Sequence, residues 1–351
     1  MILSEAVRVI IITTIAFGAA LVCTPFWARA LKRAGFAKQI RMGKDTPVFN
    51  ELHMRKAGTP TAGGVIIWST VLGLAALFGM LAALFDGAWE YLNFLNRAET
   101  YLPLAALAIA AVLGLLDDWY GVLGIGGAPG GGLKVRHKLI VYAVIAAVGA
   151  WWFYFRLEWD VLRIPFFGDF TIGWWYIPIF MFIIIASAFS ANETDGLDGL
   201  LGGVSLLAFV ALTAVAFTLG RFDLAAFGGA MMGALLAFLW HNIYPARFFM
   251  GDTGSMSLGI VIGVTSMLTN TTLLLPFFAV ILVVESLSVI IQLASKKFRG
   301  KKVFRSTPIH HHFEALGWPE SQITMRFWIV SIVFVALGLA LFFLSRVILA
   351  S

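Results

Sequence analysis

The stretch LPLAALAIAAVLGLLDD, residues 102–118, is an apolar run that ends in two adjacent aspartates. A helix needs about 20 mostly apolar residues to cross the hydrocarbon of a bilayer, with a lower limit of about 17. Two carboxylates at a membrane boundary are costly unless they are paired or bind a cation. The stretch therefore predicts a transmembrane helix with a polar site at one of its ends.

The composition of the whole chain supports the same class of protein. Of the 351 residues, 60% are hydrophobic and 13% are charged, against about 25% charged residues in an average soluble domain. A soluble core could not cover this much apolar surface, so we expect a single membrane domain over residues 1–351. The net charge of +6 could indicate nucleic acid, but loop lysines and arginines that set topology explain it better. The single Cys23 excludes an internal disulfide framework.

Ten segments are long and apolar enough to be spans. They are 7–30, 62–85, 102–118, 139–157, 173–191, 200–219, 224–241, 257–272, 273–294 and 327–348. The first is too long for the core of a signal peptide, which has about 7–15 residues. We therefore predict an all-α integral membrane protein with about ten transmembrane helices. A small hairpin is expected between Arg163 and Gly173, around Gly168.

The distribution of Lys and Arg predicts the orientation. Together with Arg29 at the end of the first span, the loops that follow alternate spans, beginning with the first, hold 19 of the 25 basic residues, and the other side holds six. The positive-inside rule places the first set in the cytoplasm and both termini outside. The clusters of polar residues lie on the cytoplasmic side, so we predict an active site at that face.

Acidic residues also gather between the fifth and sixth predicted spans, in Asn192-Glu193-Thr194-Asp195-Gly196-Leu197-Asp198-Gly199. Asp195 and Asp198 are three residues apart, so they share a face if the segment is helical. Glycines allow close approach of the backbone to a ligand. The segment predicts a binding site, although an ordinary turn with an aspartate before a helix remains the alternative.

The segment Gly251-Asp252-Thr253-Gly254-Ser255 opens the eighth predicted span. The first turn of a helix offers free amide donors to a phosphate or a carboxylate. Asp252 could be a helix cap or a metal ligand. Phe248 and Phe249 could stack on a base or anchor the interface.

Three histidines lie in Thr307-Pro308-Ile309-His310-His311-His312-Phe313-Glu314, in the last predicted cytoplasmic loop. Imidazoles facing a phosphate would donate hydrogen bonds and could transfer protons near neutral pH. Two further segments are less specific. Residues 56–64 could cradle a polar ligand or form a plain turn, and the loop 121–138 is rich in glycine and then basic.

These carboxylates, histidines and basic residues at one face suit phosphoryl chemistry with magnesium, whose hard oxygen ligands are carboxylates and substrate phosphates. Glu285 is the one carboxylate deep within a predicted span. It must be neutral, paired or facing a cavity. A transporter or flippase is the alternative from another class, but it would need polar residues through the membrane and access from both sides.

The motifs resemble those of the phospho-N-acetylmuramoyl-pentapeptide transferase family, a bacterial branch of the polyprenyl-phosphate N-acetylhexosamine-1-phosphate transferase superfamily. The resemblance extends from Lys56 to Trp328. It is carried by these motifs, in this order: 58–64 (GTPTAGG), Asp117-Asp118, 195–199 (DGLDG), 249–255 (FMGDTGS), 308–314 (PIHHHFE), Gly317-Trp318 and 326–328 (RFW). The triple histidine favours this branch over relatives that use UDP-N-acetylglucosamine, which remain the nearest alternative.

The resemblance implies ten spans, a homodimer, and a reaction at the inner leaflet of the bacterial inner membrane. UDP-MurNAc-pentapeptide and undecaprenyl phosphate would give lipid I and UMP. Mg²⁺ would be held by Asp252, with Asp117 and Asp118 as catalytic carboxylates and His310, His311 and His312 beside the phosphates. Lys138 would meet a phosphate. The nucleoside and sugar pocket would be lined by Lys56, Thr61, Asn192, Asp195, Asp198, Asn242 and Phe249.

The sequence departs from the family pattern at three places. Ala62 replaces a usual methionine, and Glu193 replaces a usual apolar residue. Gly121 lies in a glycine-rich stretch where relatives carry lysines, so no lysine from this position can contribute to the site. The sequence leaves open whether transfer is direct or passes through a phosphoryl-aspartate.

Overall fold

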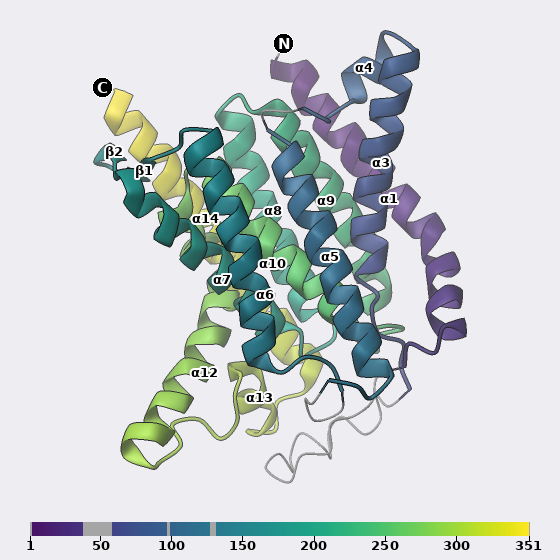
Figure 1. The fold of residues 1–351 in the computed structure, drawn as a ribbon, viewed down its shortest axis with the longest axis vertical. Helices are drawn as coiled ribbons and strands as arrows, with labels where there is room; N and C mark the ends of the chain where they lie inside the picture. The colour runs from purple at the N-terminus through teal and green to yellow at the C-terminus, as the bar shows by residue number, and fades with distance from the viewer. Residues whose placement is uncertain (1, 38–57, 97–98, 127–130, 351) are drawn as a thin grey trace.

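The computed structural model describes residues 2–37, 58–96, 99–126 and 131–350. These residues form a bundle of helices with one small two-stranded sheet (Figure 1). The helices are α1 (Ile2–Arg33), α3 (Val65–Leu84), α4 (Ala88–Leu92), α5 (Tyr101–Val122), α6 (Val135–Trp151), α7 (Tyr176–Thr194), α8 (Leu200–Thr218), α9 (Phe222–Asn242), α10 (Gly251–Leu268), α11 (Leu275–Phe278), α12 (Val280–Arg299), α13 (Ile309–Glu314) and α14 (Glu320–Ala350).

Within the described residues, eight helices are long and apolar enough to cross a membrane, or nine if one bent pair counts as a span. The all-α membrane class is therefore confirmed. The predicted span 257–272 largely coincides with α10, which is not among the eight. Its first turns carry glycines, hydroxyls and Asp252, and almost all of its residues are buried. A helix surrounded by other helices needs no continuous apolar surface, because it meets little lipid.

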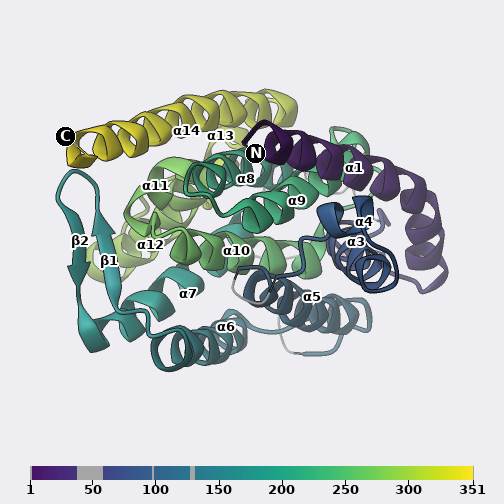
Figure 2. The same cartoon turned by 90° about the horizontal axis from the view of Figure 1, so that it is seen from above.

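Helix α10 lies near the centre of the bundle, with α5 and α7 packed along it (Figure 2). Glycines allow some of these helices to approach closely. A Cβ atom added to Gly259 of α10 would lie 2.5 Å from the carbonyl oxygen of Ser187 in α7, and one on Gly114 of α5 would lie 2.4 Å from that of Asp252. Small residues at helix interfaces are the usual means of close packing in membranes. They bring the start of α10 directly against the end of α5.

The predicted span 273–294 is broken rather than straight. Helices α11 and α12 bend by 90° at Ala279. Pro276 occupies the first turn of α11, as expected. Beyond the bend, part of α12 projects from the bundle (Figure 1). The polar stripe of α12, defined here as Glu285, Ser288, Gln292 and Ser295, is buried on one side of this helix.

Both termini lie at one end of the bundle, together with α4 and the hairpin (Figure 1). The predicted hairpin is confirmed, because β1 (Val161–Ile164) pairs antiparallel with β2 (Gly168–Thr171). The opposite end carries α13, the projecting part of α12, the last turn of α5 and the first turn of α6 (Figure 1).

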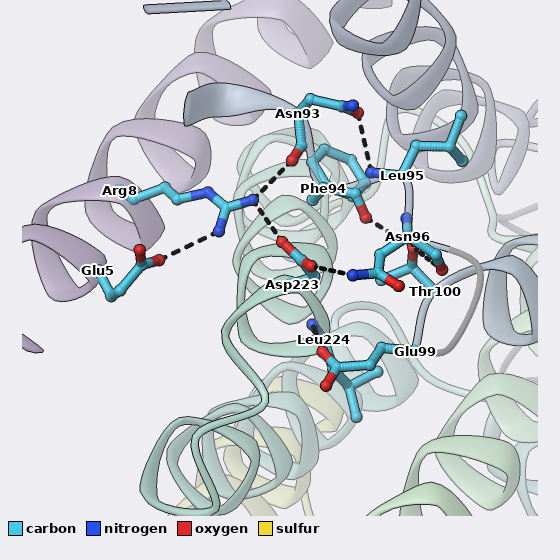
Figure 3. A network of polar contacts seen from close by, with 10 residues as sticks. All are labelled: Glu5, Arg8, Asn93, Phe94, Leu95, Asn96, Glu99, Thr100, Asp223 and Leu224. Atoms are coloured by element: carbon cyan, nitrogen blue, oxygen red, sulfur yellow. Dashed lines mark hydrogen bonds and ion pairs between the residues drawn. The ribbon is translucent and has the colours of Figure 1, made fainter. Parts of the chain in front are cut away.

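A buried arginine ties three segments together at the end that carries the termini (Figure 3). Arg8 of α1 is 6% exposed. It donates to Asp223 of α9 at 2.6 Å, to the carbonyl oxygen of Asn93 at 2.7 Å and to Glu5 at 3.1 Å. The other oxygen of Asp223 accepts from the amide of Asn96 at 2.7 Å. This network fixes the end of α9 against α1 and the segment after α4.

Candidate active site

The two aspartates at the end of α5 have different partners. One carboxylate oxygen of Asp118 accepts the backbone N–H of Asp252 at 2.9 Å, and the other accepts that of Thr253 at 3.0 Å. Asp118 therefore caps the first turn of α10, where unpaired N–H groups and the helix dipole favour an anion. Of the two anions expected at this helix start, a phosphate or a carboxylate, the structure places a carboxylate there.

The approach to α10 depends on a glycine. Gly251 has a φ of +73°, which favours glycine. A Cβ atom at this position would lie 2.6 Å from an oxygen of Asp118. Gly251 therefore allows both the turn into α10 and the contact with Asp118.

The second aspartate belongs to a charged cluster with Lys138 and Asp252. The Lys138 ammonium lies 2.9 Å from Asp117 Oδ2 and 2.6 Å from Asp252 Oδ2. The Asn192 amide donates to the other oxygen of Asp252 and, at 3.1 Å, to Ser255 Oγ. The Asp117 side chain is 1% exposed and that of Asp252 is 18% exposed. Asp252 is therefore the partly exposed carboxylate of the cluster, and Asp117 is the buried one.

Tyr142 belongs to the same region, although no sequence motif includes it. It lies one turn after Lys138 on α6, so both side chains share a face of that helix. Tyr142 is 1% exposed, and its hydroxyl has no hydrogen-bond partner among the described residues. Only its spacing of four from Lys138 could have indicated it in the sequence.

Two other predicted site residues hold neighbouring loops in place. Asn242 accepts the N–H of Gly199 at 3.0 Å and donates to the carbonyl oxygen of Phe248 at 2.9 Å. Asp198 accepts the N–H of Ala246 at 3.0 Å. Both side chains are buried. They dock the turn before α8 onto the segment between α9 and α10.

Asp198 is also fixed from α14. Its backbone N–H donates to Glu320 at 2.6 Å, and its carbonyl oxygen accepts from Thr324 at 3.1 Å. The indole of Trp328 donates to the carbonyl oxygen of Gly199 at 3.2 Å. Glu320 and Thr324 lay outside the predicted site, because no short-range signal links them to a turn more than 100 residues earlier.

Thr61 and Phe249 lie on neighbouring segments without regular secondary structure. The Phe249 N–H donates to the carbonyl oxygen of Pro60, and the Gly63 N–H donates to that of Phe249, both at 2.8 Å. Phe249 is 8% exposed. The structure thus brings the predicted segments 58–64 and 249–255 side by side. The predicted residue Lys56 lies outside the described residues.

The three histidines differ in environment. His310 is fully buried, and its Nδ1 lies 3.0 Å from Glu285 Oε2. His311 pairs with Glu314 at 2.5 Å, and His312 accepts the N–H of Arg305 at 3.1 Å. Asp195 is partly buried at the end of α7. Glu285 is therefore paired, one of the three states expected for a carboxylate in a span.

No group of three or more His, Cys, Asp or Glu side chains is arranged to hold a metal ion within the described part of the chain. The charged cluster nevertheless suits magnesium in its donor chemistry. Asp117 and Asp252 both turn a carboxylate oxygen toward the Lys138 ammonium, and Asp252 is the more exposed of the two. Magnesium is commonly bound by one or two carboxylates plus substrate phosphates.

Comparison with known proteins gives the class first. Residues 100–270 match glycosyl transferase family 4. This segment includes Asp117, Asp118, Lys138 and Asp252, the residues that the structure brings together. The match indicates a transferase, and the described part of the bundle contains helices long and apolar enough to cross a membrane.

Whole-chain relatives are more specific. Phospho-N-acetylmuramoyl-pentapeptide-transferase of Chloroflexus aurantiacus is 36% identical over 350 residues, which cover 96% of this chain and 90% of the relative. The protein of that name from Geobacillus thermodenitrificans is 37% identical over 335 residues, covering 94% and 97%. That from Rubrobacter xylanophilus is 36% identical over 301 residues, covering 84% and 86%. The chain belongs to the phospho-N-acetylmuramoyl-pentapeptide transferase family.

Proposed function

We propose that the protein transfers phospho-MurNAc-pentapeptide from UDP-MurNAc-pentapeptide to undecaprenyl phosphate, giving lipid I and UMP in peptidoglycan synthesis. Membership of the family and the charged cluster at one end of the bundle support this reaction. A phosphate oxygen of the lipid attacks the β-phosphorus of the nucleotide sugar. The bond from that phosphorus to the bridging oxygen breaks, and UMP leaves with the electron pair.

The single observation that carries the proposal is the position of Lys138 between Asp117 and Asp252. Lys138 places one positive charge where the transferred phosphate accumulates negative charge. Asp117 is the carboxylate we assign to the proton of the lipid phosphate. Asp118 has both oxygens on backbone N–H groups, which argues against a phosphoryl intermediate on Asp118.

A divalent cation is proposed as the cofactor on electrostatic grounds. With two carboxylates and one ammonium, the charged cluster is net negative, and a nucleotide diphosphate is also an anion. Asp252 would hold Mg²⁺, with Asp117 beside it. When bound, the ion would neutralise phosphate charge and stabilise the leaving UMP.

The remaining predicted residues divide by their environment. Thr61, Asp195 and Phe249 are assigned to the nucleoside and sugar pocket, as is Lys56. Asn192 orients Asp252 through its amide. Asp198 and Asn242 are assigned to shaping the pocket through the loop contacts described above.

The proposed setting is the bacterial inner membrane, with ten crossings, both termini external and the site facing the cytoplasm. The position of both termini at one end, opposite α13, supports an even number of crossings (Figure 1). The protein is proposed to act as a homodimer, which light scattering in detergent would test.

The test is UMP release by purified protein with undecaprenyl phosphate, comparing UDP-MurNAc-pentapeptide with UDP-GlcNAc, with and without magnesium. Magnesium-dependent release from the muramoyl substrate alone is expected. Release from UDP-GlcNAc alone would assign the protein to the N-acetylglucosamine branch. Absence of release from both, by protein that elutes as one folded species, would overturn the transferase assignment.

A further inference from the structure

Glu285 and His310 form a buried pair outside the charged cluster. Both residues are 0% exposed. Glu285 Oε2 lies 3.0 Å from His310 Nδ1 and 3.5 Å from the backbone nitrogen of the same residue. A buried carboxylate is costly unless it is paired and hydrogen-bonded. Glu285 Oε1 has no hydrogen-bond partner among the described residues, so His310 is the group that compensates this carboxylate, across 25 positions of sequence.

The rest of the polar stripe of α12 fixes the chain that leads to His310. Gln292 accepts the N–H groups of Val303 and Phe304 at 2.9 and 3.0 Å, and donates to the carbonyl oxygen of Phe304 at 2.9 Å. Ser295 donates to the carbonyl oxygen of Lys301 at 2.9 Å. These contacts dock the connection after α12 back onto the helix. Whereas Gln292 and Ser295 bond backbone groups of this connection, Glu285 contacts the side chain of His310.

The other ring nitrogen of His310 faces the turn that carries Asp195 and Asp198. Nε2 has no hydrogen-bond partner among the described residues. A Cβ atom on Gly196 would lie 2.2 Å from Nε2, so only a glycine leaves room for the ring. The histidine segment and the turn before α8 therefore meet at one imidazole.

We propose that Glu285 is a positioning residue of the transferase site and that it acts through His310. Glu285 orients the imidazole so that Nδ1 points toward α12 and Nε2 points toward the turn at residues 195–198. The inference rests on the proposed function, in which this turn borders the nucleotide sugar. When Nδ1 carries a proton, it donates that proton in a hydrogen bond to the Glu285 carboxylate. Nε2 is then the ring nitrogen that meets the turn.

Charge supports the same assignment. Burial opposes protonation of His310, but the Glu285 carboxylate outweighs it, and the pKa of His310 is raised. Glu314 on α13 and Glu193 on α7 also contribute negative charge there, and the His311 ring lies 4.1 Å away between centroids. A protonated His310 presents an N–H donor and a positive charge toward the turn. Loss of that proton on raising the pH should lower the rate.

The test compares Glu285→Gln, His310→Gln and the double variant by UMP release as a function of pH. Glutamine keeps an acceptor for Nδ1–H but removes the charge. We expect Glu285→Gln to lower kcat about tenfold with little change in KM. We also expect the alkaline limb of its pH profile to move to lower pH. The double variant should be no slower than His310→Gln alone, because Glu285 acts through the ring.

Ser286→Ala is the matched control, because Ser286 is a buried neighbour on α12 whose hydroxyl bonds Ser190 at 2.6 Å. Its pH profile should be that of the wild type. If Glu285→Gln does not fold, Gly196→Ala provides a second variant, since its Cβ displaces the ring without removing a buried charge. It should give the same shift of the alkaline limb.

An unshifted pH profile in Glu285→Gln overturns the inference. So does a loss of kcat that is the same at all pH values and parallels a loss of protein stability. So does a double variant in which the two losses multiply. These outcomes, with active wild-type protein, leave the proposed function intact. Folded wild-type and Ser286→Ala proteins that both release no UMP overturn the proposed function and this inference with it.

Discussion

Asp118→Asn is expected to destabilise the protein more than the same change at the adjacent Asp117. Asp118 accepts two backbone N–H groups at the start of α10. Asparagine offers one acceptor oxygen, and its NH₂ group meets the second N–H, donor against donor. A hydrogen bond to a charged group contributes about 1.5–3 kcal/mol, and a buried donor left unpaired costs about 1–3 kcal/mol. These overlap, so we expect a loss of about 2–4 kcal/mol in the free energy of unfolding.

The assay is unfolding of the purified variants in mixed detergent and SDS micelles, measured beside UMP release. Asp117→Asn is the control, because Lys138 keeps its 2.6 Å contact with Asp252 when Asp117 loses its charge. That variant should lose turnover with a smaller loss of stability. An Asp118→Asn protein as stable as the wild type, but inactive, would refute the capping role and indicate direct chemistry by Asp118.

Three further variants test other parts of the structure. Gly251→Ala should lower the unfolding free energy by about 1–2 kcal/mol for its left-handed backbone alone, and by more for the clash with Asp118; wild-type stability in the same unfolding assay would contradict this. Lys138→Gln should reduce kcat at least about tenfold, because it removes the charge between two carboxylates; unchanged UMP release would contradict the role of the charge. Arg8→Ala should cost about 1–3 kcal/mol of stability, as seen by unfolding, with kcat within twofold or so of wild type because the network lies at the far end of the bundle; a selective loss of kcat would contradict that separation.

The membrane class could be predicted from the sequence because it depends on apolar length, which is local. The hairpin near Gly168 and the proline at the start of α11 were predictable for the same reason. The bend at Ala279 was not, because Pro276 in the first turn is equally compatible with a straight span, and the polar residues that α12 buries find their partners only in the folded chain. The central place of α10 was also hidden, since its polar first turns are acceptable only within a bundle.

At the candidate site, residue type predicted which side chains are involved better than what each contacts. The sequence singled out Asp117, Asp118 and Asp252, and the structure brings them together. It could not separate the roles of Asp117 and Asp118. Adjacent residues on a helix point in different directions, and the partner that each side chain meets depends on which element packs there. The partner of Glu285 was equally hidden, since His310 reaches it only after the chain folds back from α12.

An aspartate of the site is therefore not shown to be catalytic merely because its substitution abolishes activity. Asp118 holds the first turn of α10, and Asp198 holds the loop before that helix. Removing either carboxylate displaces Asp252 or its surroundings, and a variant would be inactive even if the residue never touches substrate. Asp117 also accepts a backbone N–H, from Leu133, but it differs from both in that its other oxygen meets the Lys138 ammonium. Stability measured beside turnover is the quantity that separates a carboxylate that builds the site from one that acts in it.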